Sequence, residues 1–499
     1  MVNIAEVIWQ RGRQNPEAVA VWSPTRQLSF AELHEASSRV AATARRAGIR
    51  PLDRVVMVIP TVLEFPVLYY GLLAAGATVV TVNTMATVHE MTHIIEDAQP
   101  SLVVAWHTAS TSARIAADTA GIPIWEVGPN AQFDDDAGPA QCWDFDPLDT
   151  AVILYTSGTT GTPKGAELTA SNLVANAHAF GKVSGLAPSD RVGTALPLFH
   201  VYGQAVTMNS TLCAGGSLVL QEKFDPRSML ELVRDCGLTG LSAVPTMWIA
   251  MLGIAADFTA ADFSQLRYGT SGGAPLPLDV LLAFKERFGC IMLEGYGLSE
   301  TTGIATFNDI HKEQKPGTVG TAVPGTKIEI RQSGERLATG QVGEIYVWGS
   351  TVMKGYWNRP DATRSELVDG WLRTGDLGSL DSDGYLTIVG RAKELIVRGG
   401  YNVYPREVEE VLYEHPRVIE VAVIGVPDDY YGEEVGAVVV CGPGPAVDPQ
   451  ELRTWAKVRL AAYKVPHLFA FVDELPKAST GKILKRAIDP ALLRASPTQ

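Results

Sequence analysis

The sequence contains few cysteines, and no pattern pairs them. The five are odd in number, lie far apart and show no C-x-x-C spacing: Cys142, Cys213, Cys236, Cys290 and Cys441. This arrangement argues against a disulfide framework and a zinc site, and it indicates reduced core residues. The first residues also lack the apolar core and small-residue cleavage site of a secretory signal. We therefore expect a cytoplasmic protein.

Positive charge is also scarce. The chain has 41 basic and 55 acidic side chains, which gives a formal net charge of −14 at pH 7. Such a surface repels nucleic acid, ATP and coenzyme A (CoA) alike, so nucleic acid is not an expected partner and any anion site must be built locally. With 499 residues, 46% of them hydrophobic and 19% charged, the chain is typical of a globular enzyme with more than one domain.

Residues 65–88 contain no charged side chain and are long enough to cross a bilayer. Pro66, Gly71 and Gly76 interrupt the stretch, and its character changes to β-branched at residues 78–80. These features favour a buried helix followed by a buried strand over a transmembrane segment.

The N-terminal part alternates between helix and strand patterns. Capping-box patterns at residues 29–32 and 87–90 open two predicted helices, the first of which runs to about Arg46. Predicted strands at residues 53–59 and 102–104 follow the same rhythm. The pattern predicts an α/β fold with parallel-rich sheets, and the acidic run at residues 134–136 reads as a solvated loop.

An anion-binding loop follows the apolar strand at residues 151–154. The stretch YTSGTTGTPKG, residues 155–165, combines backbone-permissive glycines, hydroxyl donors and one cation, contributed by Thr156, Ser157, Gly158, Thr159, Thr160, Gly161, Lys164 and Gly165. A flexible connector is the alternative, but the preceding strand and Lys164 favour phosphate binding. The loop is not a Walker A motif, because Pro163 precedes the lysine and a glycine follows it.

Two later motifs suit a nucleotide. The small-residue run at residues 269–275, with Gly272, Gly273 and Ala274, permits a flat ring to approach the backbone. In the run at residues 295–301, GYGLSET, residue types suggest three roles. Tyr296 offers an aromatic face, Ser299 can donate to phosphate, and Glu300 can ligate a magnesium ion carried by ATP.

These motifs resemble those of the adenylate-forming superfamily, which includes acyl-CoA synthetases and aryl-CoA ligases. The resemblance runs from the helix after Ser29 to Lys482, with six motifs in family order. It implies that Gly297 belongs to the nucleotide site, that Asp376 accepts both ribose hydroxyls and that Arg391 contacts the nucleotide. His200, otherwise more typical of a satisfied core residue, gates the carboxylate end of the acyl pocket by the same resemblance.

The resemblance also implies two domains. An N-terminal adenylation domain would span residues 1–391, and a C-terminal lid of residues 392–499 would turn about a hinge at Lys393. Helix and strand patterns at residues 407–414, 418–426 and 435–440 independently indicate a compact α+β unit there. Within the lid, Lys482 is implied as the adenylation lysine and Gly399 and Gly400 as part of the CoA tunnel. Lys477 and Lys485 are control positions that we expect to be dispensable.

The implied activity is that of an acid–CoA ligase with ATP, Mg²⁺ and CoA as cofactor and co-substrates. A carboxylic acid would form acyl-AMP and pyrophosphate, and the CoA thiol would then displace AMP. An enzyme that loads a carrier protein shares every nucleotide motif and is the main alternative. A luciferase-like oxidase and a non-catalytic nucleotide-binding protein are further ones. The sequence leaves the oligomeric state open, a homodimer included.

The acid is predicted from candidate pocket residues, which are bulky and apolar: Tyr202, Val244, Met247, Trp248, Leu293 and Ile304. Such a pocket suits a medium- or long-chain fatty acid or an aromatic acid better than acetate. This set contains no arginine to pair a second carboxylate, which argues against malonate. The segment around His200 also lacks the aspartate with which amino-acid-activating relatives hold an amine, so an acid without an α-amino group is expected.

Overall fold

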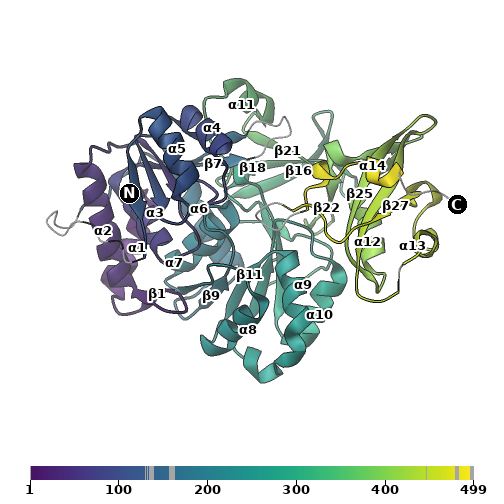
Figure 1. Cartoon of the computed structure of the whole chain (residues 1–499), viewed down its shortest axis with the longest axis horizontal. Coiled ribbons are helices and arrows are strands. Elements are labelled where there is room, and N and C mark those ends of the chain that lie inside the picture. Colours follow the sequence, from purple (N-terminus) through teal and green to yellow (C-terminus); the bar gives the residue numbers. More distant parts are fainter. Residues whose placement is uncertain are drawn as a thin grey trace.

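The computed structural model describes residues 2–129, 131, 133, 140–156, 163–445, 447–477 and 483–494. A large N-terminal domain is followed by a small C-terminal domain, whose elements gather at one end of the molecule (Figure 1). The acidic run at residues 134–136 lies outside the described residues.

One sheet of the N-terminal domain carries the strand before the predicted phosphate loop. Its order is β19-β8-β7-β4-β3-β5-β6. The strands are β3 (Arg54–Val58), β4 (Thr78–Thr81), β5 (Leu102–Trp106), β6 (Ile124–Val127), β7 (Thr150–Thr156), β8 (Lys164–Thr169) and β19 (Gly355–Tyr356). Strands β3 to β7 pair in parallel, whereas β8 is antiparallel to both of its neighbours. The predicted strands and the parallel-rich α/β arrangement are confirmed.

Helices accompany this sheet, and three of them lie where the sequence patterns predict helices. They are α1 (Ile4–Gln14), α2 (Phe30–Arg46), α3 (Glu64–Ala75), α4 (Val88–Ala98), α5 (Ser110–Ala120) and α6 (Ala170–Val183). Both predicted capping boxes are present, at the starts of α2 and α4. Residues 65–75 of α3 and all of β4 are buried, which confirms the predicted buried helix and strand. In the part of the chain that the structure describes, no helix has the length and apolar character needed to cross a membrane.

A second sheet has the order β15-β14-β13-β12-β11-β9-β10-β1-β2. Its strands are β1 (Val19–Trp22), β2 (Gln27–Ser29), β9 (Arg191–Thr194), β10 (Ser217–Leu220), β11 (Gly240–Ala243), β12 (Tyr268–Ser271), β13 (Ile291–Tyr296), β14 (Thr306–Phe307) and β15 (Thr321–Ala322). The strands from β1 to β13 along this order pair in parallel. An apolar cluster packs helices against it: α8 (Pro226–Asp235), α9 (Pro245–Ile254) and α10 (Leu278–Phe288).

The segment between β9 and β10 contains a feature that no sequence pattern predicts. Residues Tyr202–Asn209 form a π-helix, η2, which continues into α7 (Ser210–Ala214). All eight residues of the π-helix are buried. Such wide helical turns are rare and often occur at functional sites.

A third, antiparallel sheet leads towards the C-terminal domain. It consists of β16 (Thr326–Gln332), β17 (Glu335–Arg336), β18 (Gly343–Gly349), β20 (Leu367–Val368), β21 (Trp371–Leu380) and β22 (Leu386–Arg391), with α11 (Pro360–Glu366) before β20. Short 3-10 turns elsewhere are η3 (Ala255–Asp257), η4 (Ala260–Phe263), η5 (Ser299–Thr301), η6 (Ala392–Glu394), η7 (Ala462–Lys464) and η8 (Lys485–Ala487).

The C-terminal domain has a hydrophobic core of its own, which includes Ile396, Val408, Val423, Val435 and Phe469. Its elements are β23 (Ile396–Arg398), β24 (Tyr401–Val403), α12 (Pro405–Tyr413), β25 (Val418–Asp428), β26 (Gly432–Cys441), α13 (Pro449–Lys457), β27 (Leu468–Phe471) and α14 (Ala491–Arg494). They confirm the α+β unit that the sequence predicts. The labelled elements α12, α13, β25 and β27 lie beside one another in Figure 1.

Candidate active site

The predicted phosphate loop joins two antiparallel strands. Thr156, the last residue of β7, pairs with Lys164, the first of β8. The hydroxyl of Thr156 lies 3.4 Å from the Lys164 carbonyl oxygen and 3.4 Å from Oε1 of Glu300. Residues 157–162 lie outside the described residues, among them the predicted Ser157, Gly158, Thr159, Thr160 and Gly161. The described ends bring Thr156, Lys164 and Glu300 to one place.

Glu300 is the centre of a hydrogen-bonded group. The Tyr356 hydroxyl lies within donor distance of Oε1 of Glu300, at 3.0 Å, and of Oε2 of Glu366, at 2.7 Å. Lys164 forms an ion pair with Glu366 at 3.4 Å, and its Nζ lies 4.9 Å from the centre of the Tyr356 ring. Burial raises the pKa of Glu300 above its ordinary value. Tyr356 and Glu366 therefore belong to this candidate site, although no sequence motif indicates them.

The family resemblance implies a magnesium ion, so we ask whether the oxygen atoms around Glu300 could bind one. Within the described residues, no group of three or more His, Cys, Asp or Glu side chains could hold a metal ion. Magnesium is usually bound by one or two carboxylates together with phosphates of the substrate. Glu300, with the Thr156 hydroxyl and Glu366 close to it, offers oxygen donors of that kind. The residues present fit a magnesium ion that arrives with ATP.

Three residues predicted to bind the nucleoside lie together. The Tyr296 hydroxyl donates to Oδ2 of Asp376 at 2.7 Å, and Nε of Arg391 lies 3.3 Å from Oδ1 of the same carboxylate. Asp376 and Arg391 are partners in the register of β21 and β22. Asp376 is buried, whereas the Arg391 side chain is 43% exposed. Burial and the neighbouring carboxylate raise the pKa of the Tyr296 hydroxyl well above its ordinary value, which keeps the hydroxyl protonated as a donor.

The glycines near this group allow close packing of the backbone. A Cβ atom added at Gly297 would lie 2.3 Å from the carbonyl oxygen of Gly303, so no other residue fits there without movement. Gly272 and Gly273 follow the end of β12, and Gly273 has a left-handed backbone with φ of 82°. A Cβ at Gly272 would lie 3.4 Å from the Tyr202 ring. Ala274 is half-buried in the same turn, and Ser299 is half-buried at the start of η5.

Most of the predicted acyl pocket gathers in one apolar cluster. Tyr202, Val244, Leu293 and Ile304 belong to it, and Met247 packs against its edge. Trp248 lies in a different cluster, fully buried with its ring centre 4.6 Å from that of Phe284. Leu293 and Ile304 are buried as deeply, so burial does not distinguish a core role from a pocket role, and the pocket role of Trp248 stays a prediction.

His200 stands at the entrance to the π-helix. Its Nδ1 accepts a hydrogen bond of 3.3 Å from the backbone N–H of Tyr202. The Tyr202 hydroxyl reaches in turn to Thr270 at the end of β12, with Oγ1 at 2.9 Å. His200, Tyr202 and the turn at residues 272–274 thus form neighbouring parts of one wall.

The C-terminal domain meets the N-terminal domain close to the predicted hinge. Lys393 lies in η6, directly after β22. Nη1 of Arg406 donates to the Ile388 carbonyl oxygen at 2.7 Å, and Lys485 forms ion pairs with Glu394 and Glu409 at 3.7 and 2.6 Å. Gly399 and Gly400 make the exposed turn between β23 and β24, with φ of 57° and 82°. Lys482 lies outside the described residues.

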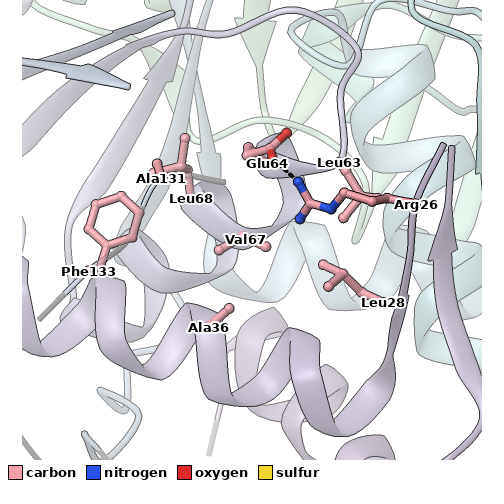
Figure 2. A pocket seen from close by; sticks show the side chains of 9 residues that line it. All are labelled: Arg26, Leu28, Ala36, Leu63, Glu64, Val67, Leu68, Ala131 and Phe133. Atoms are coloured by element: carbon pink, nitrogen blue, oxygen red, sulfur yellow. Dashed lines mark hydrogen bonds and ion pairs between the residues drawn. The ribbon is translucent and has the colours of Figure 1, made fainter. Parts of the chain in front are cut away.

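A separate small pocket lies between α2 and α3, with a volume of about 70 Å³ (Figure 2). An ion pair of 2.8 Å between Arg26 and Glu64 borders it, and the remaining lining is mostly apolar. None of the predicted site residues lines this pocket. It is distinct from the nucleotide site.

Comparisons with known proteins agree with this geometry. The model of the family described as AMP-binding enzyme matches residues 8–357, and that of the AMP-binding enzyme C-terminal domain matches residues 407–482. A feruloyl-CoA synthase of Amycolatopsis sp is 39% identical over 482 residues, which cover 95% of this chain and 96% of the relative. A long-chain-fatty-acid–CoA ligase of Bacillus subtilis (strain 168) is 37% identical over 513 residues, with coverage of 95% and 91%.

A solved structure shows the same fold across both domains. The crystal structure of ATP-bound MatB from Rhodopseudomonas palustris gives a TM-score of 0.91 at 35% identity and covers 97% of each chain. Fold and motifs together define an adenylate-forming enzyme. The chain belongs to the AMP-binding enzyme family, as the resemblance of its motifs predicts.

Proposed function

We propose that the acid activated by this ATP-dependent acid–CoA ligase is a medium- or long-chain fatty acid or an aromatic acid without a second charged group. The observation that carries the proposal is the apolar cluster of Tyr202, Val244, Leu293 and Ile304 beside the wall that contains His200. Apolar pockets with a few polar groups at one end suit ligands with an apolar body. The related feruloyl-CoA synthase and long-chain-fatty-acid–CoA ligase are named for acids of these two kinds.

The reaction has two steps. A carboxylate oxygen of the acid attacks the α-phosphorus of ATP, which forms acyl-AMP and releases pyrophosphate. The CoA thiol then attacks the acyl carbon, loses its proton, and AMP departs with the electron pair of the broken bond. The first step is needed because a carboxylate cannot expel its own oxide, whereas AMP is a good leaving group.

The proposed nucleotide roles fall to groups that lie together. Lys164 and Thr156 bind phosphate oxygens at the ends of the loop, and Glu300 would hold a magnesium ion, which would neutralise phosphate charge when bound. Asp376 accepts the ribose hydroxyls while Tyr296 holds its carboxylate from the other side. Arg391 supplies a cation next to the same carboxylate. Gly272, Gly273, Ala274, Gly297 and Ser299 form the surrounding nucleotide wall.

The C-terminal domain supplies the mobile part of the mechanism. Lys482 stabilises the negative charge of the adenylation transition state, and Lys393 is the hinge between residues 1–391 and 392–499. Rotation about this hinge withdraws Lys482 and brings the turn at Gly399 and Gly400 to the pantetheine arm of CoA. The exposed position of that turn supports this role.

A pyrophosphate-release assay with a panel of acids tests the proposal. We expect turnover with hexanoate to palmitate or with benzoate and cinnamate derivatives, and little with acetate or malonate. Addition of CoA then yields a thioester and free AMP. Best turnover on acetate or malonate would refute the pocket assignment. Acyl-AMP that forms but reacts only with a carrier protein would refute CoA as the acceptor.

We also propose that the enzyme acts in the cytoplasm, since all five cysteines are free thiols. Light scattering of the purified protein would show whether it is a homodimer.

A further inference from the structure

Helix α4 contacts both ends of the phosphate loop. The Tyr155 hydroxyl, immediately before the loop, donates to Oδ2 of Asp97 at 2.7 Å. At the other end, Nε2 of His93 lies 3.3 Å from the Pro163 carbonyl oxygen. The rings of His93 and Tyr155 also meet edge to face, with centres 6.3 Å apart. Two residues one turn apart on α4 therefore contact Tyr155 and Pro163, which immediately precede Thr156 and Lys164.

Asp97 connects this helix to a third segment. Its Oδ1 forms an ion pair of 2.8 Å with Nη2 of Arg359, and its side chain is only 8% exposed. Its backbone carbonyl oxygen accepts hydrogen bonds from Nε1 of Trp357 at 3.1 Å and Nδ2 of Asn358 at 3.3 Å. Residues 357–359 are thus attached to α4 through one aspartate.

That third segment runs directly beside the end of the loop. Strand β19 pairs Tyr356 with Ala166 of β8, and the backbone N–H of Trp357 donates to the Gly165 carbonyl oxygen at 2.8 Å. Tyr356 is also the residue that contacts Glu300. Asp97 consequently links the start of the loop, the strand after it and the neighbour of the magnesium carboxylate.

The energetics of such a group favour a role in positioning. A buried ion pair contributes little net stability, because desolvation of the charges offsets their attraction, and an apolar replacement is often as stable. What a carboxylate with several partners does supply is a fixed geometry for the groups bonded to it. When the groups of a phosphate site are already held in place, less conformational entropy is lost on ligand binding, so binding is tighter.

We propose that α4 fixes the positions of the two described ends of the phosphate loop, at Tyr155 and Pro163, and that Asp97 is a positioning residue for ATP. The inference rests on the proposal that Thr156 and Lys164 bind the phosphates. Asp97 touches no reacting atom; it acts through the Tyr155 hydroxyl and through Arg359. Loss of the Asp97 carboxylate weakens the binding of the nucleotide and leaves the binding of the acid and of CoA unchanged.

The chain offers a matched control in Asp190. This aspartate is also buried, with its side chain 3% exposed; it pairs with a half-exposed arginine, Arg267, at 2.7 Å and accepts from the Thr239 hydroxyl at 2.6 Å. It stands before β9, outside the nucleotide-site residues assigned above. Asp97→Asn and Asp190→Asn remove equivalent buried charges, so a purely structural role predicts equivalent effects.

The test measures MgATP binding by calorimetry, which requires no knowledge of the acid. We expect Asp97→Asn to raise the Kd for MgATP about 10-fold or more, since misplaced binding groups commonly cost this much or more. Asp190→Asn should remain within about twofold of wild type, and both should lower the thermal midpoint to a similar extent. In steady state Asp97→Asn should raise the KM for ATP while the KM for CoA and the thiolysis of preformed acyl-AMP stay unchanged.

Equal nucleotide affinities for the two asparagine variants would overturn the inference. If Asp97→Asn does not fold, Tyr155→Phe removes one hydroxyl and leaves the Arg359 ion pair in place. An unchanged Kd for that variant would also overturn it. Lys164→Ala separates the two levels of the argument: unaltered MgATP binding in this variant refutes the phosphate placement itself. If Lys164→Ala binds MgATP more weakly but Asp97→Asn binds it as tightly as Asp190→Asn does, only the role of α4 is refuted.

Discussion

The hydroxyl of Tyr296 and the carboxylate of Asp376 meet at 2.7 Å, although 80 residues separate them in the chain. One residue ends a strand of the second sheet and the other lies within the third. Their hydrogen bond therefore joins these two sheets at the predicted nucleoside site. It also leaves Oδ1 of Asp376 directed to Arg391.

Asp376→Ala should weaken ATP use more than Tyr296→Phe does. The alanine variant loses both acceptor oxygens for ribose, whereas the phenylalanine variant keeps them and loses only one orienting donor. We expect the KM for ATP to rise by roughly 10²-fold for the first and about 5-fold for the second, consistent with the energy of charged and neutral hydrogen bonds. Pyrophosphate release at varied ATP measures both. A larger effect for Tyr296→Phe would contradict the ribose assignment.

Lys482→Ala should block adenylation selectively. Removal of a group that stabilises transition-state charge typically lowers kcat about 10²- to 10³-fold. Acid-dependent pyrophosphate release should fall by this factor, while thiolysis of preformed acyl-AMP continues. Lys477→Ala is the proper control, because its ion pair with Glu420 lies within the C-terminal domain.

Lys485 is a poorer control than the sequence indicates. Its ion pairs with Glu394 and Glu409 reach the residue after the proposed hinge, so Lys485→Ala also disturbs the domain junction. If Lys482→Ala lost thiolysis to the same extent as adenylation, this result would falsify the proposal that Lys482 acts in adenylation and not in thiolysis.

Adjacent residues of α9 should respond differently to truncation. Trp248→Ala removes a fully buried ring and should lower the free energy of unfolding by about 3–5 kcal/mol without reordering acid preference. Met247→Ala, at the edge of the acyl cluster, should change stability little and shift preference towards bulkier acids. Denaturant unfolding and the acid panel distinguish them. A changed order of acid preference for Trp248→Ala would support its predicted pocket role.

Glu294 should make stability depend on pH. Burial is the main reason that its pKa rises from 4.5 to about 7, an effect that Arg406 partly opposes. The unfolded state therefore ionises first as pH rises from 4.5 to 7, so the folded state loses stability across that window and the loss is complete above it. Glu294→Gln should be more stable than wild type at pH 8 by up to about 3 kcal/mol, with little difference at pH 4.5. Thermal unfolding at both values measures this, and a constant difference would contradict it.

Local chemistry explains what could be predicted from sequence. The capping boxes at residues 29–32 and 87–90 and the strands around the phosphate loop depend on neighbouring residues, and the structure confirms them. Tyr356 and Glu366 carry no such local signal. Tyr356 reaches Glu300, and brings Glu366 with it, because β19 pairs with β8 across nearly two hundred residues, and that pairing is not visible in either segment alone.

The face of a helix is hard to predict when apolar residues surround it. Helix α9, with the sequence PTMWIAMLGI, has no polar side by which to orient it. Both Met247 and Trp248 are bulky and apolar, so the sequence assigns them to the same pocket, and it does not indicate that the tryptophan ring packs against Phe284. The π-helix at Tyr202–Asn209 escaped prediction for a similar reason, since no periodic pattern marks its wider turns.

The π-helix η2 lies in the wall that contains His200 and Tyr202, and its length can change by one residue. A π-helical segment contains an extra residue per turn relative to the α-helix, so deletion of a single residue can rewind it without unravelling α7. Rewinding by one residue turns the preceding side chains by about 100° around the axis, since an α-helix has 3.6 residues per turn. His200 and Tyr202 stand at that end. A one-residue gap between otherwise similar ligases would thus re-aim the residues proposed to face the acid, and new acid preferences could evolve there without replacement of any core side chain.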